Sequence, residues 1–170
     1  DEIIIGDGTA GTYYAPFNSY YAHSWTEMIY PASEIGGGYT FSSVEWNCTS
    51  VATGATITSD VYIYMGETTR SVHATSSEWT PEADLTLVYS GSSVVLGDDE
   101  WESFMLDTPF NYTGVNNLVV VVAKSIPNWN MSVKFAYTSS NNSVLRRGSD
   151  YDASYTQYPT GPGTLSEYLP

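Results

Sequence analysis

The stretch Leu118-Val119-Val120-Val121-Val122-Ala123 is apolar at every position, and it decides the fold class. Runs of β-branched residues favour strands. A strand that is apolar on both sides must be covered on both sides, so we expect this run near the middle of a sheet. A second run, Asp60-Val61-Tyr62-Ile63-Tyr64-Met65, alternates aliphatic residues with tyrosines. That alternation predicts a strand with one face in the core and its tyrosines facing outward or lining a groove.

Runs of the same kind recur along the chain, separated by clusters of Gly, Asn, Asp and Ser. No window combines a helical period with helix caps, and the best helical candidate, 81–85, is one turn at most. The sequence therefore predicts an all-β fold, a two-sheet antiparallel β-sandwich. The clearest runs are Thr26–Tyr30, Tyr39–Asn47, Ile57–Met65, Leu85–Tyr89, Trp101–Leu106, Leu118–Ala123, Val133–Tyr137 and Thr164–Leu169.

The length and composition are typical of one folded domain. The chain has 170 residues, of which 42% are hydrophobic and 15% aromatic, enough to form one core. No internal repeat or linker divides it, so we expect a single module over residues 1–170. Because the sequence starts at Asp1 without Met, we interpret it as a module excised from a longer multidomain secreted protein.

The charge of the chain excludes more partners than it selects. The net charge is −14, from 19 acidic and 5 basic residues, and this negative potential repels nucleic-acid phosphates and anionic lipid. No apolar run reaches the roughly 18 residues of a membrane helix, so we expect no membrane insertion. Neutral glycans, metal cations and basic protein surfaces remain. Cys48 is the only cysteine, which leaves no internal disulfide.

Seven runs spread over nearly the whole chain carry a resemblance: Ile5–Thr9, Tyr13–Tyr21, Ser24–Tyr30, Asp60–Met65, Leu87–Gly91, Glu100–Gly114 and Asn117–Val122. Together they resemble a β-sandwich surface module of secreted Bacteroidetes proteins, similar to the cleaved-adhesin, jelly-roll domains in gingipain haemagglutinin regions. That resemblance implies an accessory domain on the bacterial cell surface, but it supplies no ligand. The Asp-rich calcium-binding opening of the gingipain domains is not recognisable here, where Asp7 stands nearly alone.

The sequence offers little for catalysis. A nucleophilic triad needs a histidine beside a serine or cysteine and a carboxylate. Only His23, in an aromatic stretch, and His73, in a polar connection, are available, and both are interpreted as packed or solvated side chains. We therefore predict no catalytic residues and no enzyme. The alternative is a hydrolase with a carboxylate pair in a deep cleft.

One acidic cluster is a candidate metal site. Asp98, Asp99 and Glu100 follow Gly97 and precede a strand, which indicates a hairpin turn whose carboxylates point to water. Their close-set oxygens could also hold Ca²⁺, so these three residues are the candidate metal ligands. The solvated turn is the favoured interpretation, because no EF-hand spacing is present. No cofactor is required.

Aromatic residues supply the strongest functional signal. With 15 Tyr and 5 Trp, the chain has more flat rings than a core of this size easily buries, and an exposed ring beside polar groups can stack on a sugar. Tyr13, Tyr14, Phe17, Tyr20, Tyr21 and Trp25 are interpreted as scaffold, and Trp46 and Trp79 as core. The candidate binding residues are Trp129, with Asn128 and Asn130 in one turn, and Tyr151, Tyr155, Tyr158 and Gln157 on a long late loop. Covering the open end of the sandwich is an equally good interpretation of the late loop.

These observations favour a non-catalytic, extracellular binding module that recognises a polysaccharide or glycan through loop aromatics. We expect it outside the cell or on the bacterial cell surface, as a monomer. The alternative is an adhesin that binds a host or cell-surface protein, or a structural spacer domain.

Overall fold

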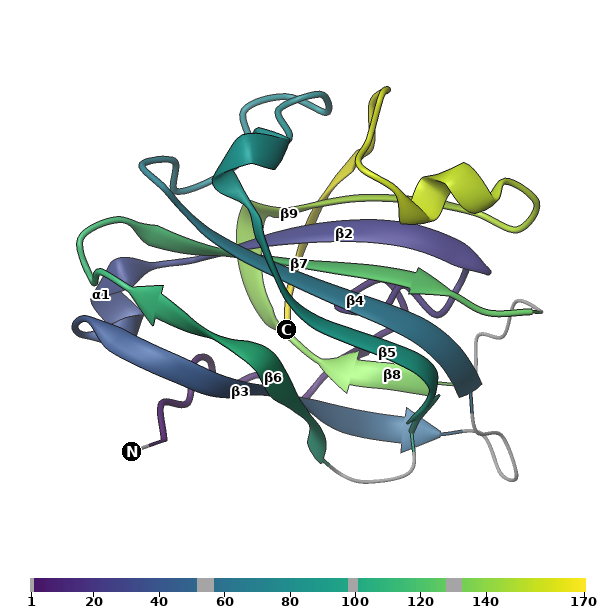
Figure 1. Cartoon of the computed structure of the whole chain (residues 1–170), viewed down its shortest axis with the longest axis horizontal. Helices are drawn as coiled ribbons and strands as arrows, with labels where there is room; N and C mark the ends of the chain where they lie inside the picture. Colours follow the sequence, from purple (N-terminus) through teal and green to yellow (C-terminus); the bar gives the residue numbers. More distant parts are fainter. Residues whose placement is uncertain (1, 52–56, 98–100, 128–132) are drawn as a thin grey trace.

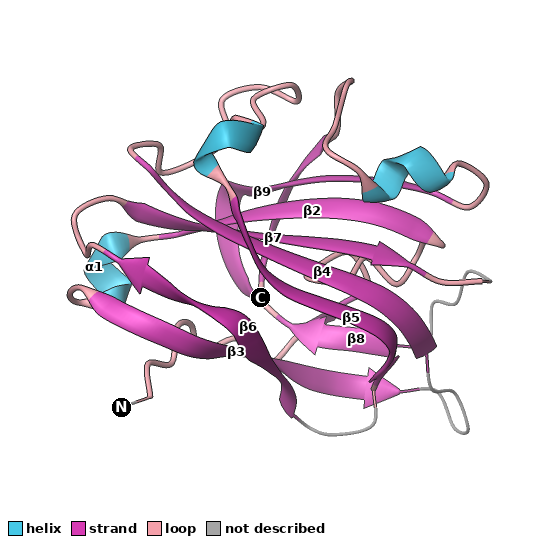
Figure 2. Cartoon of the chain, viewed as in Figure 1, coloured by secondary structure: helices cyan, strands magenta, loops and turns pink. Residues whose placement is uncertain are grey.

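The computed structural model describes residues 2–51, 57–97, 101–127 and 133–170 and confirms the predicted β-sandwich (Figures 1 and 2). A four-stranded sheet has the order β1-β8-β3-β6, and a six-stranded sheet has the order β10-β9-β2-β7-β4-β5. All the strand pairs are antiparallel. The strands are β1 (Gly11–Thr12), β2 (His23–Tyr30), β3 (Tyr39–Val51), β4 (Ile57–Thr68), β5 (Thr86–Leu96), β6 (Trp101–Tyr112), β7 (Asn117–Ser125), β8 (Val133–Ala136), β9 (Thr138–Ser149) and β10 (Thr164–Leu169).

In the described part of the chain, helical structure is limited to short turns. The α-helix α1 spans Ala32–Ile35, and the 3₁₀ turns η1 and η2 span Glu82–Asp84 and Ala153–Thr156. The turn η1 confirms the single turn predicted at 81–85. Among the described residues there is no apolar helix long enough to cross a membrane.

Strand β7 lies in the middle of the six-stranded sheet, between β2 and β4, as its apolar sequence predicts. Val120 and Val122 belong to the cluster between the two sheets. Val119 and Val121 belong to a second cluster on the opposite face. The large sheet is therefore covered on both faces, which explains why β7 tolerates no polar residue from Leu118 to Ala123.

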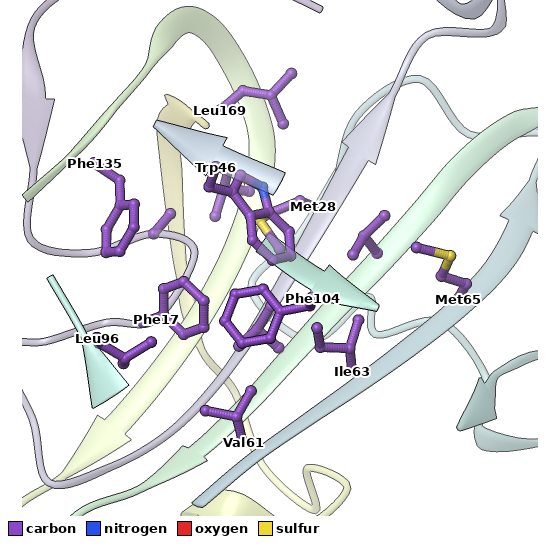
Figure 3. Close-up of a cluster of buried hydrophobic side chains, with 14 of the residues drawn as sticks. Phe17, Met28, Trp46, Val61, Ile63, Met65, Leu96, Phe104, Phe135 and Leu169 are labelled. Atoms are coloured by element: carbon purple, nitrogen blue, oxygen red, sulfur yellow. The ribbon is translucent and has the colours of Figure 1, made fainter. Parts of the chain in front are cut away.

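Aromatic rings fill the space between the two sheets (Figure 3). Phe17 has no exposed surface, and its ring centroid lies 5.0 to 5.5 Å from those of Trp46, Phe104 and Phe135. Phe17 belongs to the segment 13–22, which joins β1 to β2. This connection therefore contributes a side chain to the core as a strand would, and it is fixed in place by that side chain.

The outer face of the six-stranded sheet is covered by two long connections, 69–85 and 150–163. Trp79, Leu85 and Tyr158 from these connections pack on the outer apolar cluster. The Trp79 indole N–H donates to the Gly161 carbonyl at 2.9 Å, and the Tyr158 hydroxyl donates to the Thr80 carbonyl at 3.0 Å. These bonds tie the two connections together into one outer layer, defined here as residues 69–85 and 150–163. The tyrosines of β4, at positions 62 and 64, lie beneath that layer.

The chain passes from one sheet to the other at Tyr137, between β8 and β9. Strand β8 pairs with β3 only at Cys48, Ser50 and Val51, and β9 then begins at Thr138 in the six-stranded sheet. No strand or described backbone group pairs with the same edge of β3 from Tyr39 to Asn47. A groove between the two sheets opens along this edge.

Candidate functional site

Two of the sequence-predicted sites lie outside the described residues. These are the turn with Asn128, Trp129 and Asn130, and the candidate calcium ligands Asp98, Asp99 and Glu100. Among the residues that are described, no three His, Cys, Asp or Glu side chains gather as a metal site would require.

The late loop separates its four predicted binding residues into two kinds. Tyr151 is 95% exposed, and Gln157 is also exposed. The Tyr155 ring instead lies against the Arg147 guanidinium, whose carbon is 3.9 Å from the ring centroid. Tyr158 is half-buried and packs edge-on against Trp25, with centroids 5.8 Å apart. Tyr151 and Gln157 are thus available to a ligand, whereas Tyr158 holds the outer layer in place.

Five other tyrosines form a continuous surface that we call the tyrosine surface. Tyr14 lies at the centre, with centroid distances of 5.6 Å to Tyr20 and 6.0 Å to Tyr168. The ring centroids of Tyr20 and Tyr21 lie 5.0 Å apart, and those of Tyr168 and Tyr137 lie 4.8 Å apart. Tyr20 is 37% exposed, and the other four rings are half-buried. Among the described residues no hydrogen-bond partner occurs for these phenolic hydroxyls, so all five remain free to bond to a ligand or to water.

Arg146 places a positive charge at the tyrosine surface. Its guanidinium carbon lies 3.9 Å from the Tyr14 ring centroid, a cation–π contact. Burial lowers the pKa of Arg146 from its ordinary value, and the nearby Tyr14, Tyr21 and Tyr168 oppose that shift. Its side chain makes no hydrogen bond or ion pair to a described residue. In a chain of net charge −14, a cation without a carboxylate partner is available to polar or anionic ligand groups.

The fold gathers these rings from distant parts of the sequence. Tyr14, Tyr20 and Tyr21 lie on the connection 13–22, whose end is fixed because the Lys124 ammonium donates to the carbonyl oxygens of Tyr21 and Ala22. The Tyr21 ring lies so close to Gly148 of β9 that a Cβ there would sit 2.4 Å from it. Tyr137 stands at the crossing between sheets and Tyr168 on β10. The sequence interpretation treated the first three rings as scaffold and missed the surface they form.

A groove runs along β3. It encloses about 830 Å³, which is the size of a small-molecule or peptide site. Its floor consists of core side chains from both sheets, including Tyr30, Trp46, Met65 and Val120. Its sides are formed by residues 2–9 and by β3 from Tyr39 to Asn47. No Lys or Arg lines it among the described residues.

The hydrolase alternative predicts an acid in an apolar pocket. Of the described side chains that line the groove, Glu2, Asp7 and Glu45 are carboxylates, and all three are exposed. His23 contacts Ser125 through Nδ1 at 2.9 Å, and no described carboxylate makes a hydrogen bond to its ring. In a catalytic triad, one ring nitrogen faces the serine and the other the carboxylate. The pair is therefore a cross-strand contact between β2 and β7.

A buried polar cluster lies under the outer layer. The Glu27 carboxylate, on β2, has no exposed surface and accepts hydrogen bonds from the Thr80 amide and hydroxyl at 2.6 to 3.1 Å. Arg70 lies 3.5 Å from it, and His73 Nδ1 lies 3.9 Å away. Burial raises the pKa of Glu27, while the Thr80 and Arg70 bonds oppose that rise. With no exposed surface, Glu27 cannot reach a substrate, and its contacts instead bind the outer layer to β2.

His73 gives this cluster a predictable pH dependence. Burial lowers the pKa of His73 from 6.5 to about 4, so the imidazole is neutral near pH 7 and its contact with Glu27 is not an ion pair. Between these values the unfolded chain binds the proton more tightly than the folded chain. This contribution to stability is present above pH 6.5 and is lost as the pH falls toward 4.

We therefore expect His73→Phe to reduce the loss of stability, measured as the free energy of unfolding, that occurs as the pH falls from 6.5 toward 4. Urea unfolding from pH 7 to pH 4 measures the free energy of unfolding of wild type and variant. The wild-type value should fall more steeply than that of the variant, by up to about 1.4 kcal/mol per pH unit. Subtracting the two profiles removes the opposite contribution of Glu27, whose raised pKa makes its stabilisation fade as the pH rises. Parallel profiles would contradict the assignment to His73.

No family model, curated protein or solved structure matches this chain. The resemblance to Bacteroidetes surface modules therefore stays a prediction, and the site must be interpreted from its own geometry.

Proposed function

We propose that this chain is a non-catalytic, extracellular binding module whose tyrosine surface recognises a glycan. The observation that carries the proposal is the gathering of Tyr14, Tyr20, Tyr21, Tyr137 and Tyr168 around Arg146, with five phenolic hydroxyls free of described partners. A surface formed only for packing would bury these rings or bond their hydroxyls. Location on a bacterial cell surface is part of the same proposal.

The chemistry of the surface suits a sugar better than it suits other ligands. A pyranose ring has an apolar C–H face and a rim of hydroxyls, so it can stack on one tyrosine while its hydroxyls bond to neighbouring phenols. The Arg146 guanidinium adds a donor and a positive charge, which favours sugars that carry a carboxylate or sulfate. Tyr151 and Gln157, both exposed on the late loop, lie outside the tyrosine surface and form the alternative contact region.

The proposal predicts that removing single rings weakens glycan binding without unfolding the protein. Tyr20→Ala and Tyr168→Ala should each reduce affinity roughly 3- to 10-fold, because an aromatic contact contributes about 0.5–1.5 kcal/mol. Affinity electrophoresis against a panel of neutral, uronic and sulfated polysaccharides, followed by calorimetry on the best ligand, measures this. Tyr168→Phe separates the loss of a hydroxyl from the loss of a ring.

Matched variants decide where the ligand binds. Tyr151→Ala, which removes a ring that is 95% exposed and outside the tyrosine surface, should leave affinity nearly unchanged. If Tyr151→Ala or Trp129→Ala abolishes binding while Tyr20→Ala does not, the ligand uses the loops predicted from the sequence instead. A panel with no binder contradicts the glycan proposal. Release of reducing ends from any bound polysaccharide contradicts the non-catalytic one.

A further inference from the structure

The edge of β3 from Tyr39 to Asn47 is open because β8 leaves the sheet early. Strands β1 and β3 are both antiparallel partners of β8, so they run in the same direction on either side of it. After Ala136 the chain crosses to β9 in the other sheet, and the place where β8 would continue is vacated. An open strand edge presents unpaired N–H and C=O groups, which is the requirement for adding a strand from another chain.

The N-terminal segment borders this vacated position without filling it. Ile3 and Ile5 pack against the core, whereas Ile4 is 65% exposed, so the segment alternates like a strand. No described backbone hydrogen bond joins residues 2–9 to β3. The segment is instead anchored at Asp7 and Gly8, whose amides lie 3.2 Å from the Thr138 hydroxyl oxygen. We call the groove between the two segments the slot, because it lies where β8 would continue as the single strand between β1 and β3.

The lining of the slot specifies the chemistry of an occupant. Apolar side chains on its floor, such as Met65, Leu118 and Val120, favour a strand with an apolar residue at every second position. Glu2, Asp7 and Glu45 are exposed around it, and no described Lys or Arg lines it. Side chains that face solvent between the apolar positions therefore meet negative charge, which favours Lys and Arg.

We propose that this groove accepts an extended segment of a partner protein as an added strand along β3, apolar at every second residue and basic between. A second copy of this chain fits less well, because it has the same net charge of −14 and its strand-like segment starts with Glu2. The proposal does not depend on glycan binding, because the tyrosine surface and the slot are bordered by different side chains, with only Tyr137 in common.

Synthetic peptides of about six residues, the usual strand length, test the proposal. A blocked peptide of alternating Lys and Val should bind the full chain in calorimetry, and a peptide of alternating Glu and Val should not. The same Lys–Val peptide methylated at every backbone nitrogen should lose binding, because none of its amides can then donate a strand hydrogen bond. Binding should slow hydrogen exchange at amides of β3 between Tyr39 and Asn47.

Protein variants provide the matched controls. Glu45→Lys should weaken binding of the Lys–Val peptide roughly 2- to 5-fold, as expected for one exposed charge pair. Glu82→Lys makes the same change at an exposed position of the outer layer and should have no effect beyond that of net charge. Tyr20→Ala should leave peptide binding unchanged, which separates a failure here from a failure of the glycan proposal.

Four results would overturn the inference. The first is equal binding of the N-methylated and unmodified peptides. The second is exchange protection at the edge of β10 instead of β3. The third is a dimer without peptide, detected by analytical ultracentrifugation and lost on deletion of residues 2–5, which would assign the groove to a second copy. Absence of binding by the Lys–Val peptide also rejects the proposed occupant.

Discussion

Arg70→Met is expected to lower the free energy of unfolding by about 3 kcal/mol, because it leaves the Glu27 carboxylate buried without its cation. The Arg70 guanidinium also donates to the Glu78 carbonyl and to the Thr80 hydroxyl, so it joins the outer layer to β2 through several bonds. Methionine keeps an unbranched, apolar stem of similar length, which limits the loss of packing. Urea denaturation at pH 7 measures the effect.

A double-mutant cycle separates the charge from the packing at this site. Glu27→Gln alone should cost less than Arg70→Met, and the double variant should recover part of the loss, because no buried charge remains unpaired. The cost of Arg70→Met should also shrink as the pH falls and Glu27 takes up a proton. Additive losses in the cycle, or a cost that does not vary with pH, would show that Glu27 and Arg70 are not coupled.

Phe17→Ala is expected to cost about 3–5 kcal/mol, the range for truncating a buried phenylalanine. The side chain has no exposed surface and its ring meets those of Trp46, Phe104 and Phe135 between the sheets. The effect should exceed that of most strand substitutions, because Phe17 also holds the connection 13–22 that presents part of the tyrosine surface. Thermal or urea unfolding gives the measurement.

Two variants from the same connection serve as controls for Phe17→Ala. Phe17→Leu keeps most of the buried volume and should cost clearly less than alanine. Tyr20→Ala removes a ring that is 37% exposed and should change stability little, even though it should weaken glycan binding. A loss for Phe17→Ala no larger than that for Tyr20→Ala would mean that the connection contributes little to the core.

The sequence predicted those strands whose pattern of apolar residues indicates which of their faces are buried. Leu118–Ala123 requires cover on both faces, and the alternation of Val61, Ile63 and Met65 requires one face in the core. Strand β9 was missed because it begins with Thr138-Ser139-Ser140-Asn141-Asn142, which has no apolar alternation. Its first two residues, Thr138 and Ser139, pair with Leu169 and Tyr168 of β10, a long-range contact that no local pattern records.

The candidate site was harder to predict than the fold for a related physical reason. Tyr14 and Tyr168 are stacked in space but lie 154 positions apart in the sequence, so no spacing rule connects them. A local signal did exist for the buried cluster: Glu27 is the only acid within the apolar run of β2. A carboxylate in a strand that is covered on both faces needs buried donors, and Thr80 and Arg70 supply them.

The outer layer has a consequence for how this protein opens. Its attachment relies on Trp79 and Tyr158 against one face of the large sheet and on the bonds to Glu27, while the sandwich itself is closed by a separate cluster on the other face. We therefore expect that the outer layer can detach while the two sheets of the sandwich stay packed together. Such a partial opening would uncover Trp25 and a negative charge, yet leave the binding surfaces on the rest of the molecule assembled.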